Sequence, residues 1–497
     1  MRGLSQFHEN DRLIQWIQTS GGKLALWLIA TALLLPSHRS ILVPLFLGLT
    51  MIWPKRRQLL VLIAAPLVGL ELMGGSFWDL PHDPGRFPKL VSAIPAVVTV
   101  LLLVLLSIAA AKNFERLPAF VRRHPVLTLH LLVCGLIILT WPVFPEGADR
   151  IYWMRLGTVF GLLPFLVWRC CYIMLSGQRG SAKESSYADH LFYALPVFGG
   201  TNVPYGKGYD YLRRCWAADP QALARSQLAG LKLLFLYWLW LGARRLIEAL
   251  AHGDYQHWPS AAKDYGIADS FKLNIPELDD LVAMSTSLPP SLADAWSSLF
   301  LGLIVAALSI AILGHGIIGS LRLFGFNVFR NTYKPLLAES IVEFWNRFYY
   351  YFKELLVEFF FYPVYARYFR NHQRLRVFAA VFAAACLGNI YYHVLRDIWK
   401  LHDLSMADAL ASVGPRSFYM VLLATGIYFS MMAQTRKRDT ALPVDASWLE
   451  PLHRVRRIAG VWLFYALIRI WNVSSPDADF GTRTAFFFSL FGLDVHF

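Results

Sequence analysis

Long apolar segments recur along the whole chain. The four clearest are 91–111, 297–321, 377–395 and 417–435, none of which contains Lys, Arg, Asp or Glu. A helix of roughly 20 apolar residues spans the hydrocarbon core of a bilayer. Only helices and closed barrels satisfy the backbone hydrogen bonds there. Because the apolar residues are continuous rather than alternating, the sequence predicts membrane-spanning helices.

Further apolar segments bring the predicted total to about eleven membrane helices, with 24–35 and 41–53 as two short helices or one helical hairpin. They are 24–35, 41–53, 59–73, 125–145, 151–175, 228–243, 458–471 and 480–493. The predicted fold class is therefore all-α: a polytopic membrane protein with additional re-entrant or interfacial helices. Residues 1–23 are amphipathic and are predicted to lie on the cytoplasmic surface. Residues 24–497 are predicted to form a single membrane domain.

Composition and charge support this class. The chain is 56% apolar and 16% charged, whereas soluble domains contain about 25% charged residues. The net charge is +14, and Lys and Arg cluster between apolar segments, as the positive-inside rule expects. This pattern favours contact with membrane lipids or an anionic donor and argues against nucleic acid. The acidic loop 252–294 is predicted to lie outside, 322–376 on the cytoplasmic side and 400–416 outside.

The cysteines show no spacing typical of metal ligands. They are predicted to be small buried hydrophobic residues without a disulfide framework. The five cysteines are Cys134, Cys170, Cys171, Cys215 and Cys386.

The segment 338–368 is too charged to span a membrane and too aromatic for an ordinary loop. Charged residues such as Glu343 and Lys353 alternate there with aromatic residues such as Trp345 and Tyr349. Two interpretations stay open. The charges lie at membrane depth and line a wet cavity, or the segment is an interfacial helix with its aromatic rings at the lipid headgroups.

His393 lies in the apolar segment 377–395, and an ionisable side chain in such a segment is a functional-site hypothesis. Asn389 and Asp397 lie four residues before and after it, so they share its helix face and are predicted to orient the imidazole. Imidazole titrates near neutral pH, which suits deprotonation of an acceptor hydroxyl. The alternative is a histidine that only packs near a helix end.

Three separated stretches resemble the membrane-bound O-acyltransferase (MBOAT) family, specifically the bacterial branch of alginate O-acetyltransferases and D-alanyl transferases of teichoic acids. The stretch 344–349, Phe-Trp-Asn-Arg-Phe-Tyr, is similar to the family's Phe-Trp-x-Arg-Trp-His/Asn motif, with a histidine downstream on an apolar helix. The stretch 191–212 resembles the one before the family's central helices, and 458–469 resembles its closing helix. The resemblance spans about residues 40–493.

The resemblance implies that His393 is the catalytic base. The second catalytic position of the motif, His or Asn in the family, falls on Tyr349. Asn346 lies three residues before it. Either side chain would donate a hydrogen bond to the substrate carbonyl or position the acceptor.

Other residues are implied to support this site. The supporting residues are Trp345, Asn389 and Asp397. Arg347 and Lys353 would bind the phosphates of an acyl-CoA donor, or an acidic acyl carrier protein. The thioester is a substrate, and no resident cofactor or metal is expected.

The implied function is transfer of an acyl group, acetyl by analogy, from the thioester to a hydroxyl of a cell-surface or exported glycan. Transfer is direct or passes through a periplasmic or secreted partner protein, and the location is the bacterial cytoplasmic (inner) membrane, crossed many times. Two alternatives remain. One is a transporter or flippase with His393, Asn389 and Asp397 as a proton relay. The other is a non-catalytic scaffold of a glycan export complex, favoured by Tyr349 in the His/Asn position.

Overall fold

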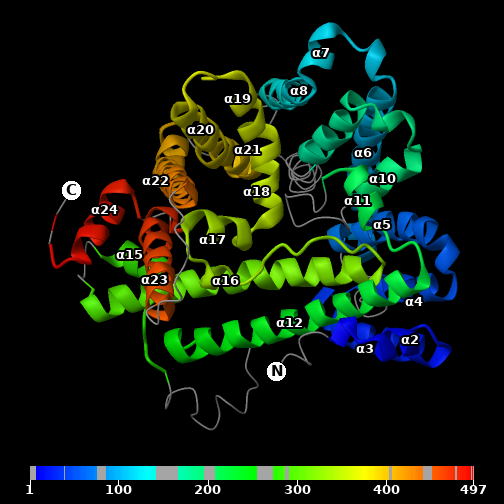
Figure 1. Ribbon diagram of the computed structural model, residues 1–497, viewed down its shortest axis with the longest axis horizontal. Helices are drawn as coiled ribbons and strands as arrows, with labels where there is room; N and C mark the ends of the chain where they lie inside the picture. The colour runs from blue at the N-terminus through cyan, green and yellow to red at the C-terminus, as the bar shows by residue number, and fades with distance from the viewer. Residues whose placement is uncertain are drawn as a thin grey trace. The chain divides into compact units, whose positions relative to one another are not determined.

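The fold is known from a computed structural model, which describes residues 7–38, 40–74, 86–140, 166–194, 207–254, 272–285, 290–401, 406–439, 450–475, 478–493 and 495. In these ranges the regular elements are helices, and the only β-type pairing is an isolated bridge between Trp216 and Phe326. The predicted all-α class is confirmed for the described residues (Figure 1). The chain divides into two compact units, Met1–Tyr237 with Leu313–Arg330, and Trp238–Ile312 with Asn331–Phe497.

Helices of the N-terminal half make up the first unit. Its elements are η1 (Phe7–Glu9), α2 (Asp11–Ile17), α3 (Ser20–His38), α4 (Leu42–Ile52), η2 (Pro54–Arg56), α5 (Arg57–Gly74), α6 (Arg86–Lys112), η4 (Phe114–Arg116), α7 (Ala119–Arg123), α8 (Pro125–Thr140), a helix over 166–178, η6 (Ser181–Lys183), α10 (Tyr187–Ala194) and α11 (Tyr209–Cys215). The start of α12 (Pro220–His252) and the end of α16 (Leu292–Leu323) complete it.

Glycines let α12 and α16 approach closely within the first unit. A Cβ on Gly230 would lie 2.6 Å from the carbonyl oxygen of Gly319, a distance that no real side chain tolerates. Ser226 Oγ donates to the carbonyl of Arg322 at 2.8 Å beside this contact. Small residues at a helix crossing allow such backbone contact where apolar burial does not drive association.

The second unit contains the predicted functional segment. Its elements are α15 (Leu278–Met284), η8 (Pro335–Leu337), α17 (Ile341–Phe348), α18 (Tyr350–Leu356), η9 (Val357–Phe361), α19 (Tyr362–Arg367), α20 (Gln373–Phe382), η10 (Ala383–Gly388), α21 (Asn389–Leu401), α22 (Met406–Asp439), α23 (Glu450–Arg469), η11 (Ile470–Asn472) and α24 (Phe480–Ser489). The end of α12 and the start of α16 also belong to it.

Within the second unit, α17 is held against α23 and η8. The Phe344 side chain is 1% exposed, and its ring stacks on Tyr465 with the centroids 3.9 Å apart. Tyr465 Oη donates to the carbonyl of Ile341 at 2.9 Å, and Trp462 Nε1 donates to that of Leu336 at 2.8 Å. The closing helix thus positions the aromatic segment through both packing and hydrogen bonds.

Three helices in the described residues are long and apolar enough to cross a membrane. They are Leu292–Leu323, Gln373–Asp397 and Ser412–Thr435, in agreement with three of the four clearest apolar segments. The pair Asp11–Ile17 and Ser20–Pro36, bent by 93°, would be a fourth if it formed one span. These helices indicate a helical protein that is associated with a membrane. The total of about eleven spans stays a prediction.

Some of the other predicted segments lie within helices, and some lie partly outside the described residues. Residues 91–111, 228–243 and 59–73 lie inside α6, α12 and α5, respectively. Part of 151–175 and part of the loop 252–294 lie outside the described residues.

The predicted amphipathic start contains α2, which buries Ile14 and Ile17 and leaves Trp16 exposed. The following helix, α3, begins at Ser20, just before the predicted boundary at residue 24.

Candidate functional site

His393 lies on α21, the helix that directly follows a π-helix. The π-helix η10 joins α20 to α21, and a second π-helix, η9, packs against it. A Cβ on Gly388 would lie 2.6 Å from Cγ of Phe360, so only glycine permits this contact. π-Helical turns are rare and are frequent at functional sites. The local geometry therefore marks the start of α21 as a candidate site.

Aromatic rings connect His393 to the predicted motif. The His393 ring lies 6.3 Å from that of Phe352 on α18, centroid to centroid. The Phe352 ring lies in turn 5.5 Å from that of Tyr349 and 6.2 Å from that of Trp345. The structure thus brings together two parts of the sequence that the motif predicted to be close, with Phe352 between them.

Asn389 and His393 each present a buried atom without a partner. Asn389 is 2% exposed, and its Nδ2 donates to the carbonyl of Ala385 at 3.4 Å. Its Oδ1 and the Nδ1 of His393 have no hydrogen-bond partner among the described residues. The predicted orientation of the imidazole by Asn389 is therefore not achieved through these two atoms. Unpaired buried polar atoms are costly and are expected where a ligand completes the bonding.

Asp397 forms ion pairs with two arginines. Its Oδ1 accepts from Nε of Arg396 at 3.0 Å and its Oδ2 from Nη2 of the same side chain at 2.6 Å. Nη1 of Arg416 on α22 donates to Oδ2 at 3.2 Å. The carboxylate that was predicted to orient the imidazole is thus engaged by two arginines and links α21 to α22, and its orientation of the imidazole stays a prediction.

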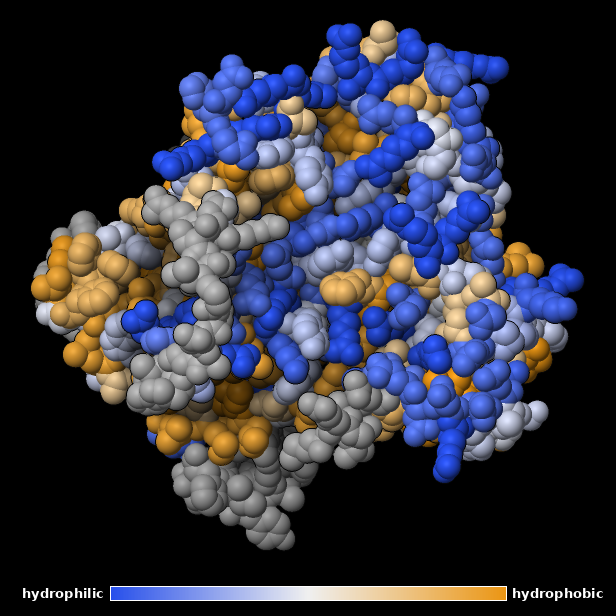
Figure 2. Space-filling view, in the orientation of Figure 1, coloured by the Kyte–Doolittle hydropathy of each residue, from blue (hydrophilic) through white to orange (hydrophobic). Residues whose placement is uncertain are grey.

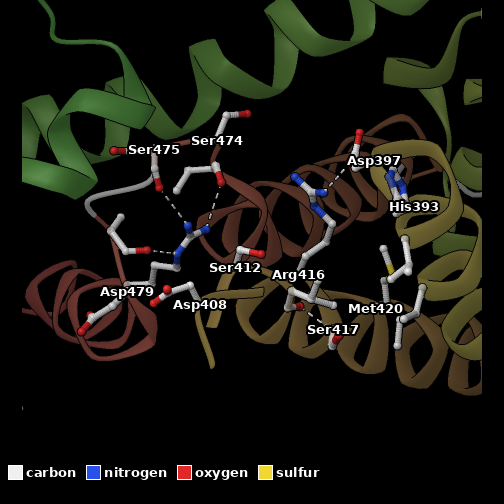
Figure 3. A pocket seen from close by; sticks show the side chains of 16 residues that line it. His393, Asp397, Asp408, Ser412, Arg416, Ser417, Met420, Ser474, Ser475 and Asp479 are labelled. Atoms are coloured by element: carbon white, nitrogen blue, oxygen red, sulfur yellow. Dashed lines mark hydrogen bonds and ion pairs between the residues drawn. The ribbon is translucent and has the colours of Figure 1, made fainter. Parts of the chain in front are cut away.

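A cavity of about 470 Å³ lies beside His393 (Figure 3). Its wall comes from α21, from α22 and from the chain between η11 and α24. The polar lining residues are His393, Asp397, Asp408, Ser412, Arg416, Ser417, Ser474, Ser475, Asp479 and Arg483, and the apolar ones are Ile390, Val394, Val413, Met420, Val473 and Ala478. Asp408, Ser412, Ser474 and Asp479 are exposed, whereas Met420 is buried. The cavity therefore has a polar mouth and an inner end that is partly apolar.

One buried arginine binds both described parts of this cavity wall, 473–475 and 478–483. Arg483 donates from Nε to the carbonyl of Ala478 at 2.7 Å, from Nη1 to that of Val473 at 3.1 Å and from Nη2 to that of Ser475 at 3.3 Å. Asp479 caps α24 by accepting from the backbone N–H of Thr482 at 2.7 Å. The two side chains thus join residues 473–475 to the start of α24.

Asn346 and Tyr349 differ in their surroundings. Asn346 is exposed on α17, whereas Tyr349 is half-buried and follows that helix with a non-helical backbone (φ −142°, ψ 77°). Tyr349 shares the ring cluster of Phe352. Of the two predicted second catalytic residues, Tyr349 is thus the one in the aromatic cluster beside His393.

The two predicted donor-binding cations form local ion pairs. Arg347 Nη2 lies 2.5 Å from Glu343 Oε1, one helical turn earlier. Lys353 Nζ pairs with Glu354 and lies 4.8 Å from the ring centroid of Tyr350. These pairs reduce the positive charge that either residue offers to a phosphate.

Unpaired positive charge lies instead between α19 and α20. Residues 366–375 are all exposed, and Arg367, Arg370 and Arg374 among them have no acidic partner in the described part of the chain. This turn, between the labels α19 and α20 in the upper left part of Figure 1, lies in a region where Figure 2 shows hydrophilic side chains in blue. We call residues 366–376 the basic turn.

The sequence did not single out most of the cavity wall. Arg416 was assigned to a loop because the apolar segment begins at Ser417. The lining residues of 473–475 and 478–483 are distant in sequence from α21 and α22, and no local pattern reveals that they lie beside these helices. A signal did exist for Arg416, because a charged residue one position outside a predicted span lies at membrane depth if the helix continues.

No protein-family model matches the chain, and no curated protein matches its sequence significantly.

Proposed function

We propose that the protein is a membrane O-acyltransferase with His393 as general base, as the resemblance to the MBOAT family implies. One observation carries the proposal. The unpaired Nδ1 of His393 is buried in a side chain that lines a cavity, and the unpaired Oδ1 of Asn389 lies one helical turn before it on the same helix face. A substrate hydroxyl is the kind of group that would satisfy such atoms.

The proposed reaction begins with proton transfer from the acceptor hydroxyl to the imidazole of His393. The hydroxyl oxygen attacks the thioester carbonyl and forms a tetrahedral oxyanion. The phenol of Tyr349, rather than the exposed Asn346, is the proposed hydrogen-bond donor to that oxyanion. Collapse of the intermediate breaks the C–S bond, and the leaving thiolate takes the proton from the imidazolium.

The proposed donor is acyl-CoA or an acyl carrier protein, bound on the cytoplasmic side at the basic turn. Arg367, Arg370 and Arg374 supply exposed charge there, while Arg347 and Lys353 are paired. The candidate span Gln373–Asp397 begins at this turn and contains His393 near its other end. A donor from one side and a glycan acceptor from the other would then meet at His393, in a chain proposed to lie in the bacterial inner membrane.

The test uses purified protein with acetyl-CoA and membranes that contain the native glycans. Wild-type protein is expected to release free CoA and to form acyl esters. His393→Gln is expected to lose this activity by about 10²-fold or more. His453→Gln, at an exposed histidine on α23 outside the basic turn and the cavity lining, is the matched control and should retain turnover. Full acyl transfer by folded His393→Gln would refute the proposal.

A transporter is the second candidate, favoured by the ion pairs of Asp397 with Arg396 and Arg416 in a cavity wall. Ionisable groups at membrane depth mark ion and proton pathways. The same purified protein decides between the two. Thioester consumption supports the acyltransferase, whereas proton-coupled solute flux in vesicles without thioester consumption supports the transporter.

A further inference from the structure

Two arginines share one carboxylate beside His393. Asp397 pairs with the guanidinium groups of both Arg396 and Arg416. The other carboxylates that line the cavity, those of Asp408 and Asp479, form no ion pair with Arg416 among the described residues. A guanidinium group that shares its carboxylate has donors left for a further anion.

Arg416 is the arginine of this cluster that lines the cavity. Its Nη1 donates to Asp397, whereas its Nε and Nη2 donate to no group in the described part of the chain. Figure 3 shows the guanidinium directed toward Asp397, on the side of the cavity where His393 lies. The side chain is 29% exposed, so a ligand in the cavity can reach it.

The other arginine of the wall differs. All three nitrogens of Arg483 donate to backbone carbonyls, so this side chain serves the turn. Asp479 is occupied by its cap on α24. Arg416 is therefore the lining cation with free donors for a ligand.

We propose that Arg416 binds an anionic group, carboxylate or phosphate, of the molecule that occupies the cavity. A guanidinium binds either anion through parallel N–H donors. The description of that molecule as the acyl acceptor rests on the proposed function, but the anion site itself does not. Bound in this way, the acceptor would carry its anion at Arg416 and its hydroxyl at His393. Its source is an acidic sugar or a phosphate-bearing lipid headgroup.

The experiment measures binding to full-length protein in a non-ionic detergent by calorimetry, at low ionic strength and in a buffer without carboxylate or phosphate. Two anions and their neutral counterparts are the probes: D-glucuronate against D-glucose, and glycerol 3-phosphate against glycerol. At least one anion is expected to bind about tenfold more tightly than its counterpart. Preference for glucuronate identifies an acidic sugar, and preference for glycerol 3-phosphate a phosphorylated headgroup.

Arg416→Gln is expected to remove this preference, because the neutral amide cannot pair with an anion. Arg416→Lys keeps the charge and should retain part of it, which separates loss of charge from loss of fold. Arg454→Gln is the matched control. Arg454 lies on α23, outside the cavity lining, and its Nε is 2.9 Å from Oε1 of Glu339. This change should not affect anion binding.

Two results would overturn the proposal. One is equal or absent binding of anions and neutral probes by wild-type protein up to roughly 10 mM, where even a millimolar site is mostly filled. The other is an anion preference that survives in Arg416→Gln. Acyl transfer without an anion preference would refute this proposal alone, whereas an anion preference without acyl transfer would refute only the proposed function.

Discussion

At the scale of single residues, the site consists of groups that lack their usual partners. His393 Nδ1 and Asn389 Oδ1 are buried and unpaired within the described residues, and Arg416 retains free donors. An unsatisfied buried polar atom costs about 1–3 kcal/mol. We expect a bound molecule to satisfy such groups, and the hydroxyl of the proposed acceptor would do so at His393.

Gly388 gives a direct prediction at this scale. Gly388→Ala places a methyl group against the Phe360 ring, with the Cβ 2.6 Å from Cγ. Overpacking of this kind costs about 1–3 kcal/mol, so the thermal unfolding midpoint in detergent should fall. Gly460→Ala is the control, because nothing lies within 4 Å of a Cβ there. That change should be neutral or slightly stabilising. Equal midpoints for both variants would contradict the packing described for η9 and η10.

His190 on α10 gives a prediction about pH. Burial lowers the pKa of His190 below 6.5, and Lys112 lowers it further, while Asp189 and Asp210 partly oppose this. The unfolded chain therefore takes up the proton first on acidification. The stabilising contribution is present above the unfolded pKa and is lost as the pH falls through the folded one.

Hydrogen exchange measures this loss in α10. After correction for the intrinsic rate, exchange of its amides should accelerate below about pH 6.5 in the wild type. His190→Gln, which cannot be protonated, should show a flatter profile. An unchanged profile in that variant would assign the pH response to another group.

At the scale of elements, the decisive feature is the break between α17 and α18. The non-helical backbone at Tyr349 separates Asn346, exposed on α17, from Phe352, which packs near His393. If helical periodicity is extended across 344–353, it therefore gives a wrong position for one of the two candidate second catalytic residues, Asn346 and Tyr349. The sequence predicted that this segment and His393 would be close, because the motif implied it, but a single non-helical residue decides which side chain is near.

The proposed binding of the acyl donor at the basic turn can be tested by substitution. Arg370→Gln with Arg374→Gln should raise the KM for acyl-CoA about tenfold and change kcat little, since these charges would contact the CoA phosphates and not the reacting bond. Arg347→Gln should have a smaller effect, because Arg347 already pairs with Glu343. Initial-rate kinetics at two salt concentrations measures both. A larger effect of Arg347→Gln would return the donor site to α17.

At the scale of the whole molecule, three of the long apolar segments correspond to candidate membrane spans, whereas shorter ones lie in helices whose crossing of a membrane stays a prediction. The segments 297–321, 377–395 and 417–435 became long apolar helices, because a run of that length has no stable alternative in a bilayer. The segment 480–493 corresponds to α24, which ends at Ser489 and contains the buried Arg483. The cavity escaped prediction because its three wall segments are adjacent only after folding.

The topology can be tested by side-specific labelling. Asn371→Cys in the basic turn and Asp408→Cys at the cavity mouth lie in exposed positions at opposite ends of the proposed topology. A membrane-impermeant maleimide should modify Asp408→Cys from outside intact cells and Asn371→Cys only after the cytoplasmic face is opened. The parent chain with its five cysteines gives the background. Labelling of both positions from one side would exclude a crossing between them.

The π-helix before His393 has a consequence for how related chains would align. A π turn contains about one residue more than an α turn, and each residue of an α-helix advances about 100° around the axis. The widened turn at Ala383–Gly388 therefore shifts the phase of everything after it relative to α20. Loss of a single residue there, such as the exposed Leu387, would leave both halves of the span helical and turn His393 away from the cavity. In an alignment, a gap of one position at this point would thus distinguish two kinds of chain. In one the histidine faces the site, and in the other only the helix is shared.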